Sequence, residues 1–192
     1  MKFLFIVPLV ALLVGCATSS NLSVTYTLSD PKTQSVVVLG VKPDYRVRVD
    51  EGGLQGNAFK FDSFASGKFS LTPVDGYIVT TLNATPEGSR YAITYIFDMH
   101  HLLPHAYTPC KNTTPTFTIS PGSVVYLGDY SFQESSDGLG RAVSYDEKSV
   151  KQYLDHHYPG LSGLPFINEH AVDMHVIGEP CGTPILIPIP IG

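Results

Sequence analysis

The chain has 192 residues, with 17 Asp and Glu against 12 Lys and Arg and a formal net charge of -5 at pH 7. The sequence contains no run of basic residues, which argues against nucleic acid as a partner and against binding to anionic lipid headgroups. A length of this order accommodates one domain of ordinary size, so we expect a single folded domain.

The first predicted element is an apolar segment at the N-terminus. A single Lys is followed by an apolar run from Phe3 to Val14, and the small residue Gly15 stands directly before Cys16. This run is too short to cross a hydrocarbon core of about 30 Å as a helix, because such a span needs about 20 apolar residues. We therefore predict a signal peptide at residues 1–15 that is removed on export.

The four residues Leu13–Cys16 resemble the lipobox of bacterial lipoproteins. That resemblance implies a diacylglycerol on the Cys16 thiol and two or three acyl chains in all, so the lipid bilayer is an expected partner. Each methylene buried in the bilayer contributes about 0.8 kcal/mol. One acyl chain therefore holds a protein only marginally, whereas two or three chains make the attachment effectively permanent. Residues 16–21 form a short linker, which reaches only about 20 Å when extended. Ala17, in place of an Asp, implies sorting to the outer membrane, facing the periplasm.

Residues 22–192 are predicted to form one β-sandwich domain. As far as Phe132 the chain consists of short runs rich in Val, Ile, Thr, Tyr and Phe, separated by Gly, Pro, Asn and Asp. Such runs are typical of strands, and PVDG and SPG between them are turn signals. Many short strands without alternating helices indicate a mainly β fold, and we predict an antiparallel β-sandwich rather than a parallel sheet.

One helix is predicted in the C-terminal half, at about residues 145–157. Ser144 and Glu147 fit a capping box, apolar residues follow at helical spacing, and Pro159 with Gly160 ends the run. The later sequence AVDMHVI is predicted to be a strand.

The C-terminal sequence TPILIPIPIG combines strongly apolar Ile residues with three Pro residues. Proline removes a hydrogen-bond donor and is excluded from central strands. We therefore predict an extended edge segment, held near its start by Cys181.

Cys110 and Cys181 form an even pair once Cys16 carries lipid. In an oxidising compartment they are predicted to form a disulfide. The bond closes a loop of about 70 residues and contributes roughly 4 kcal/mol on the chain-entropy model. A two-thiol metal or redox site is the alternative, although the sequence has no CxxC pattern.

A hairpin pattern of the form Gly-Tyr and Pro-Gly-x-x-x-Tyr-x-Gly occurs in GKFSLTPVDGYIVTTL, GSRYAITYIF and TFTISPGSVVYLGDYSF. Over roughly Lys68 to Phe132 the chain resembles uncharacterised bacterial lipoproteins with small transthyretin-like or immunoglobulin-like sandwich domains. The resemblance implies a fold and a location in the cell envelope, and it brings no catalytic residues. The absence of Trp, the helix and the Pro-rich tail are departures from that pattern.

Histidine clusters raise a second hypothesis, a metal site. The triplet Asp-Met-His occurs twice, each time shortly before a Cys of the predicted disulfide. The disulfide would bring the triplets toward each other and form a soft site for copper or zinc. Its ligands would be Met99, His100, Met174 and His175. The alternative places these side chains in surface loops, since no HExxH or other fixed ligand spacing is present.

Motifs for catalysis and cofactor binding are weak. The run PGLSGLP around Ser162 lacks the spacing of a GxSxG elbow, and GGLQG at residues 52–56 lacks the Lys of a P-loop. We therefore predict no cofactor and a non-enzymatic envelope lipoprotein that binds or scaffolds something at the membrane surface, with another envelope protein as a candidate partner. A metal-binding envelope protein is the second hypothesis. A hydrolase is the third, since a Ser, a His and an acid can come from anywhere in a chain.

Overall fold

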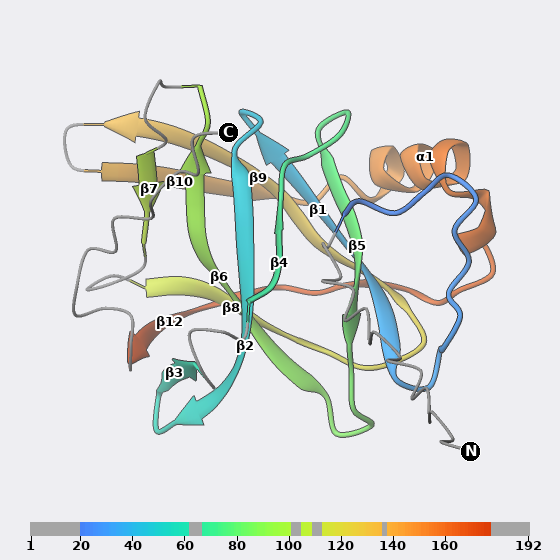
Figure 1. Ribbon diagram of the computed structural model, residues 1–192, viewed down its shortest axis with the longest axis horizontal. Coiled ribbons are helices and arrows are strands. Elements are labelled where there is room, and N and C mark those ends of the chain that lie inside the picture. Colours follow the sequence, from blue (N-terminus) through green and yellow to red (C-terminus); the bar gives the residue numbers. More distant parts are fainter. Residues whose placement is uncertain (1–19, 62–66, 101–104, 109–112, 136–137, 178–192) are drawn as a thin grey trace, which may run out of the picture.

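A computed structural model describes residues 20–61, 67–100, 105–108, 113–135 and 138–177. The described chain is mainly β, as predicted, with its strands in two sheets and one α-helix beside them (Figure 1). The predicted signal peptide, Cys16, Cys110, Cys181 and the Pro-rich tail lie outside the described residues.

The first sheet is built around β1, Gln34–Lys42. Its neighbours are β5 (Tyr77–Asn83), which is antiparallel to it, and β9 (Val124–Ser135), which is parallel to it. Strand β10 (Gly138–Ser144) pairs antiparallel with β9, and the short β11 (Phe166–Asn168) pairs parallel with the first residues of β9.

The second sheet has seven strands, two of which, β2 and β6, also pair with each other. In spatial order its strands are β4 (Gly67–Leu71), β2 (Arg46–Gln55), β3 (Ala58–Phe61), β12 (Val172–Ile177), β8 (Thr113–Ile119), β6 (Ser89–Asp98) and β7 (His105–Tyr107). The β2–β6 pairing closes five of these strands, β2, β3, β12, β8 and β6, into a ring. Figure 1 shows β2 and β6 crossing the centre of the molecule.

The prediction of a purely antiparallel sandwich was wrong, because both sheets are mixed. The pairs β1–β9, β9–β11 and β3–β12 are parallel. Each joins strands that lie far apart in the chain, and local alternation of apolar residues does not reveal which distant strands pair. The uninterrupted apolar run of β1 reflects its central position in the sheet. A strand that is buried on both faces has no solvent-facing side, so its apolar residues do not alternate with polar ones.

The core lies on both sides of β1. Val37 and Leu39 belong to a large cluster that packs against the second sheet. Val36 and Val38 face the opposite way and pack against the helix through Val150. Burying one such side chain contributes about 1.5 to 3 kcal/mol, so β1 anchors both layers of the fold.

Helix α1 spans Glu147–His157 and ends where Pro159 was expected to end it. The predicted capping box was wrong. The N-cap is Asp146, whose side chain accepts a hydrogen bond from the Ser149 backbone N–H at 3.0 Å. Ser144 is instead the last residue of β10, paired with Asp129, so its backbone belongs to the sheet. The strand predicted from AVDMHVI is confirmed as β12.

Candidate functional site

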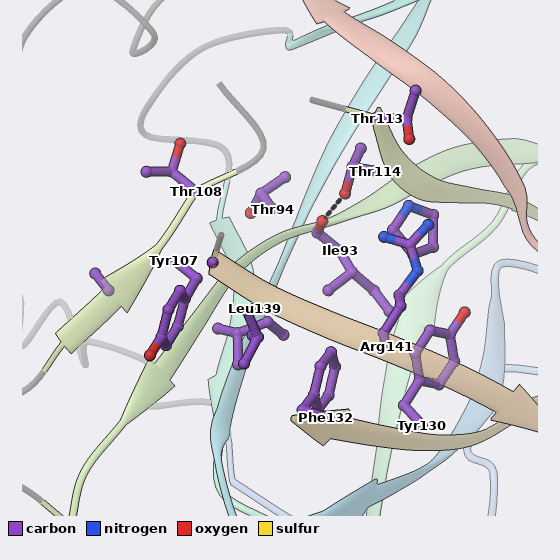
Figure 2. A pocket seen from close by; sticks show the side chains of 14 residues that line it. Ile93, Thr94, Tyr107, Thr108, Thr113, Thr114, Tyr130, Phe132, Leu139 and Arg141 are labelled. Atoms are coloured by element: carbon purple, nitrogen blue, oxygen red, sulfur yellow. Dashed lines mark hydrogen bonds between the residues drawn. The ribbon is translucent and has the colours of Figure 1, made fainter. Parts of the chain in front are cut away.

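A pocket of about 590 Å³ lies between β6, β7, β8 and the β9–β10 hairpin (Figure 2). Its apolar lining comes from all of these elements. Ala106 is the contribution of β7, and the larger apolar residues are Ile93, Ile96, Pro115, Tyr130, Phe132 and Leu139. Most of these side chains also belong to the large core cluster, so the walls of the pocket are fixed by packing rather than by loops. A pocket of 300 to about 1,000 Å³ is typical of small-ligand sites.

The polar lining is made of hydroxyl groups and one cation. Its residues are Thr94, Tyr107, Thr108, Thr113, Thr114 and Arg141. Thr114 Oγ1 donates a hydrogen bond to the carbonyl oxygen of Ile93 (Figure 2). The Tyr107 hydroxyl donates to Glu134 Oε1. These bonds commit the hydroxyl protons of Thr114 and Tyr107 to protein acceptors.

Arg141 is the cationic side chain of the pocket. It lies on β10 and forms an ion pair with Asp173 of β12, with side chains that are 27% and 55% exposed. Figure 2 shows its guanidinium pointing from β10 toward the end of the pocket where Thr113 and Thr114 lie. The positive charge is therefore concentrated at one end of the pocket.

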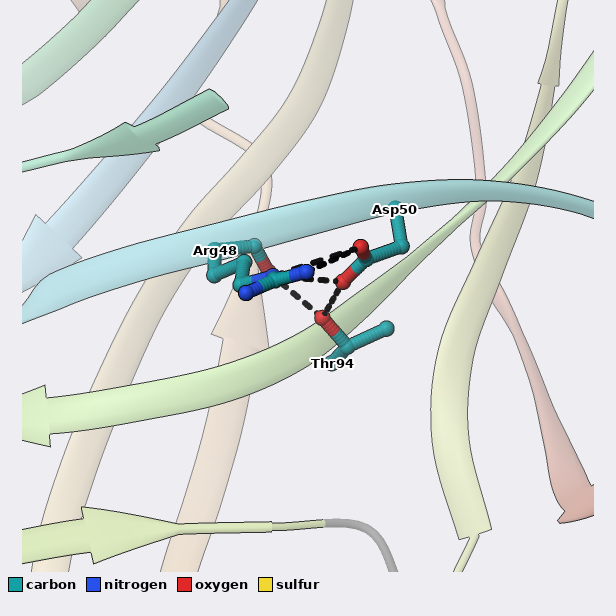
Figure 3. A network of polar contacts seen from close by, with 3 residues as sticks. All are labelled: Arg48, Asp50 and Thr94. Atoms are coloured by element: carbon teal, nitrogen blue, oxygen red, sulfur yellow. Dashed lines mark hydrogen bonds and ion pairs between the residues drawn. The ribbon is translucent and has the colours of Figure 1, made fainter. Parts of the chain in front are cut away.

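An ion pair between Arg48 and Asp50 lies next to Thr94, which is a residue of the pocket lining (Figure 3). Arg48 Nη2 lies 2.8 Å from Asp50 Oδ1, and Arg48 Nε lies 3.0 Å from Asp50 Oδ2. The Asp50 side chain is 1% exposed. Thr94, which lines the pocket, donates its hydroxyl proton to Asp50 Oδ2. This contact ties the pocket wall to the ion pair.

The position of Thr94 follows from an irregularity in the β2–β6 ladder. Arg48 pairs with Tyr95 and Val49 pairs with Ile93, so Thr94 is the extra residue of a bulge. A bulge lets adjacent side chains escape strict alternation. Here it places Thr94 within reach of Asp50 while both neighbours of Thr94 keep their ladder partners.

Burial raises the pKa of two tyrosines of the pocket. The pKa of Tyr107 lies well above its usual value, first because of burial and then because its hydroxyl bonds to Glu134. Burial likewise raises the pKa of Tyr130, which is 2% exposed. Both phenols therefore stay protonated at neutral pH, and Tyr107 is the donor in its bond to Glu134.

The residues of the metal hypothesis have different surroundings. His100 Nδ1 lies 2.9 Å from Asp98 Oδ1, and its side chain is 61% exposed. Met99 is exposed. Met174 packs against Phe59 and Ala92 in a small cluster inside the strand ring.

His175 is exposed on β12, opposite Thr113 and Ala58. Within the described ranges, no group of three or more His, Cys, Asp or Glu side chains could hold a metal ion. The metal site remains a prediction. So do the lipidation of Cys16 and the disulfide, whose residues are not described.

Sequence reasoning missed the ion pair and the pocket. A usable signal for the pair was present, because Arg48 and Asp50 alternate with Val47 and Val49 along a predicted strand. Two opposite charges two residues apart point to the same face of a strand. The pocket left no comparable signal, since its lining comes from strands distant in sequence.

Comparison with protein-family models, with curated proteins and with solved structures gave no match to this chain. None of the helices in the described part of the chain is long and apolar enough to cross a bilayer.

Proposed function

We propose that this protein is a lipid-tethered binding protein of the bacterial envelope, which holds a small ligand in the pocket between β6, β7, β8 and the β9–β10 hairpin. The observation that carries the proposal is the pocket itself. Its volume of about 590 Å³ falls within the range of small-ligand sites, and it combines an apolar lining with a few convergent polar groups.

The chemistry of the lining favours binding over catalysis. The polar groups are threonine and tyrosine hydroxyls and one guanidinium. Hydroxyls that already donate to fixed protein acceptors orient a ligand by accepting hydrogen bonds from it. A guanidinium with a pKa above about 12 holds an anion without exchanging a proton.

The tether is proposed from the sequence. The apolar run that ends in Gly15 and Cys16 supports export and lipid attachment, and Ala17 supports placement on the periplasmic side of the outer membrane. A linker of six residues, 16–21, keeps the start of the domain within about 20 Å of that surface. The ligand is thus proposed to be a solute of the periplasm.

The test is a screen of the full chain carrying Cys16→Ser, by ligand-observed NMR, against a panel of sugars, sugar acids, amino acids and dipeptides. Ala106→Trp adds an indole to an exposed position that lines the pocket. The matched control is Ala142→Trp, at an exposed position of β10 outside the pocket lining. We expect at least one compound to bind, and Ala106→Trp but not Ala142→Trp to abolish its binding. Binding that survives Ala106→Trp, or a panel without a binder, contradicts the proposal.

A further inference from the structure

Three hydroxyls of the pocket lining, those of Thr94, Tyr107 and Thr114, have protein acceptors for their protons. A threonine or tyrosine hydroxyl has one proton to donate and two lone pairs. Thr114 gives its proton to the Ile93 carbonyl, and Tyr107 gives its proton to Glu134. Thr94 has two partners, the carboxylate of Asp50 and the carbonyl of Arg48, and both of them can only accept. What remains for a ligand at each of these oxygens is a lone pair.

Arg141 supplies the opposite chemistry. A guanidinium has five N–H donors in a planar fork, and the ion pair with Asp173 engages one terminal nitrogen of Arg141. The fork matches a carboxylate, which it can bind through two parallel hydrogen bonds. Because the guanidinium points toward Thr113 and Thr114 (Figure 2), a donor group and an acceptor group of the protein lie at the same end of the pocket.

We propose that the pocket selects a carboxylic acid that has an N–H or O–H donor on the atom next to its carboxylate. The carboxylate binds the Arg141 guanidinium, and the adjacent donor bonds to Thr114 Oγ1. This inference rests on the proposed binding function and specifies the class of ligand. Both the hydroxy acid of an oxidised sugar and the terminal carboxylate of a short peptide have this arrangement.

The pocket has room for a ligand of about two such units, because its volume of about 590 Å³ lies near the middle of the range of small-ligand sites. Beyond the polar end, Ile93, Phe132 and Leu139 provide an apolar surface, and Tyr107 offers a further acceptor. A disaccharide acid or a dipeptide can therefore place its second unit on the apolar lining.

Two pairs of probes test the inference on the full chain with Cys16→Ser, by isothermal titration calorimetry. Lactobionate is compared with lactose, and alanyl-phenylalanine with its C-terminal amide. Each pair differs at the carboxylate, and the two pairs distinguish a sugar source from a peptide source. We expect the acid of at least one pair to bind about tenfold or more tightly than its neutral counterpart, because a charge-assisted bidentate contact is lost.

Variants locate the effect. Arg141→Gln should remove the preference for the acid, whereas Arg90→Gln, with the same change of net charge on β6 outside the pocket lining, should leave it intact. Thr114→Val should weaken binding of the acid about fivefold or more, since the acceptor is lost, and Thr114→Ser should restore it. Thr114→Ser keeps the hydroxyl, so it also serves if Thr114→Val does not fold.

Equal binding of acid and neutral counterpart, or a preference that survives Arg141→Gln, overturns the inference. If Ala106→Trp still blocks that binding, the proposed function stands and only the ligand class is wrong. If Ala106→Trp leaves the binding intact, the pocket is not the site and the proposed function fails with it. Absence of binding by all four probes at millimolar concentration also overturns the ligand class.

Discussion

The carboxylate of Asp50 accepts hydrogen bonds from two guanidinium nitrogens of Arg48, two residues earlier on the same strand. Asp50 is almost completely buried, while the Arg48 side chain is 21% exposed. The pair therefore holds a carboxylate inside the fold. Removing the Arg48 guanidinium leaves that buried carboxylate without the cation that it binds.

We expect Arg48→Met to lower the free energy of unfolding by about 3 to 5 kcal/mol, since it leaves a buried carboxylate unpaired. Urea denaturation at neutral pH measures the change. Lys68→Met is the matched control, because the ion pair between Lys68 and Glu51 is 31% and 28% exposed and should contribute less than about 1 kcal/mol. Equal losses in the two variants would show that the buried pair has no special role.

Gly40 is predicted to tolerate no side chain. A Cβ at this position of β1 would lie 2.0 Å from Asp129 Oδ1 and 3.0 Å from the Asp129 Cα. Gly40→Ala should therefore destabilise the protein by about 1 to 3 kcal/mol through overpacking. Gly53→Ala is the control, since no heavy atom lies within 4 Å of a Cβ there, and its effect should stay within about 0.5 kcal/mol. The measurement is thermal denaturation. A Gly40→Ala protein that is as stable as Gly53→Ala, or more stable, would contradict the close packing of β1 on β9.

The stability of the protein should depend on the charge of Asp129. Burial raises the pKa of Asp129 above its ordinary value of 3.8. The hydrogen bond from Tyr126 opposes this shift, and the nearby Asp146 carboxylate adds to it. The folded state therefore binds the Asp129 proton more tightly than the unfolded state does. The stability that this proton contributes to the folded state is lost as the pH rises through the folded pKa of Asp129. Asp129→Asn should be more stable than the wild type at neutral pH, and that advantage should vanish below about pH 3.8.

Asp146 provides a control of opposite sign. Its pKa is lowered, first by the hydrogen bond from the Ser149 hydroxyl and then by that from the Ser149 backbone N–H. The ionised Asp146 carboxylate therefore stabilises the folded state. This stabilisation is complete above the pKa that Asp146 has in the unfolded state, and it is lost as the pH falls through the folded pKa. Asp146→Ala should thus lose stability at neutral pH and approach the wild type at acid pH. The measurement is the melting temperature of each variant relative to the wild type, from acid to neutral pH. If Asp129→Asn and Asp146→Ala both gain or both lose stability at neutral pH, the opposite pKa shifts of the two residues are wrong.

The disulfide remains a prediction from the sequence. Cys110 and Cys181 are expected to be bonded if the protein is exported to an oxidising compartment and Cys16 carries lipid, as we propose. A thiol-specific label applied to denatured, unreduced protein should find no free thiol, and prior reduction should expose two. Two labelled thiols before reduction would exclude the bond.

Local patterns predicted the elements better than their partners. Strand content, the end of α1 at Pro159 and the strand β12 were all visible in residue type and spacing. The N-cap was wrong because Ser144 is held by the ladder to β9, a long-range contact that outweighs a local capping preference. The parallel pairs and the pocket depend on strands distant in sequence, and a single sequence does not specify those pairings. Arg141, for example, becomes a ligand-binding candidate only because the fold brings β10 and β8 to the walls of one pocket.

The proposed function requires Cys16 to tether the ligand-binding domain to the envelope. Metabolic labelling with a radioactive fatty acid in a bacterial host, followed by membrane fractionation, tests the tether most directly. The wild type and the control Cys110→Ser should be labelled and recovered with membranes, because both keep the Cys16 thiol that we propose as the acceptor of the lipid. Cys16→Ser should be unlabelled and soluble. A Cys16→Ser protein that is still labelled and membrane-bound would show that Cys16 is not the lipid anchor.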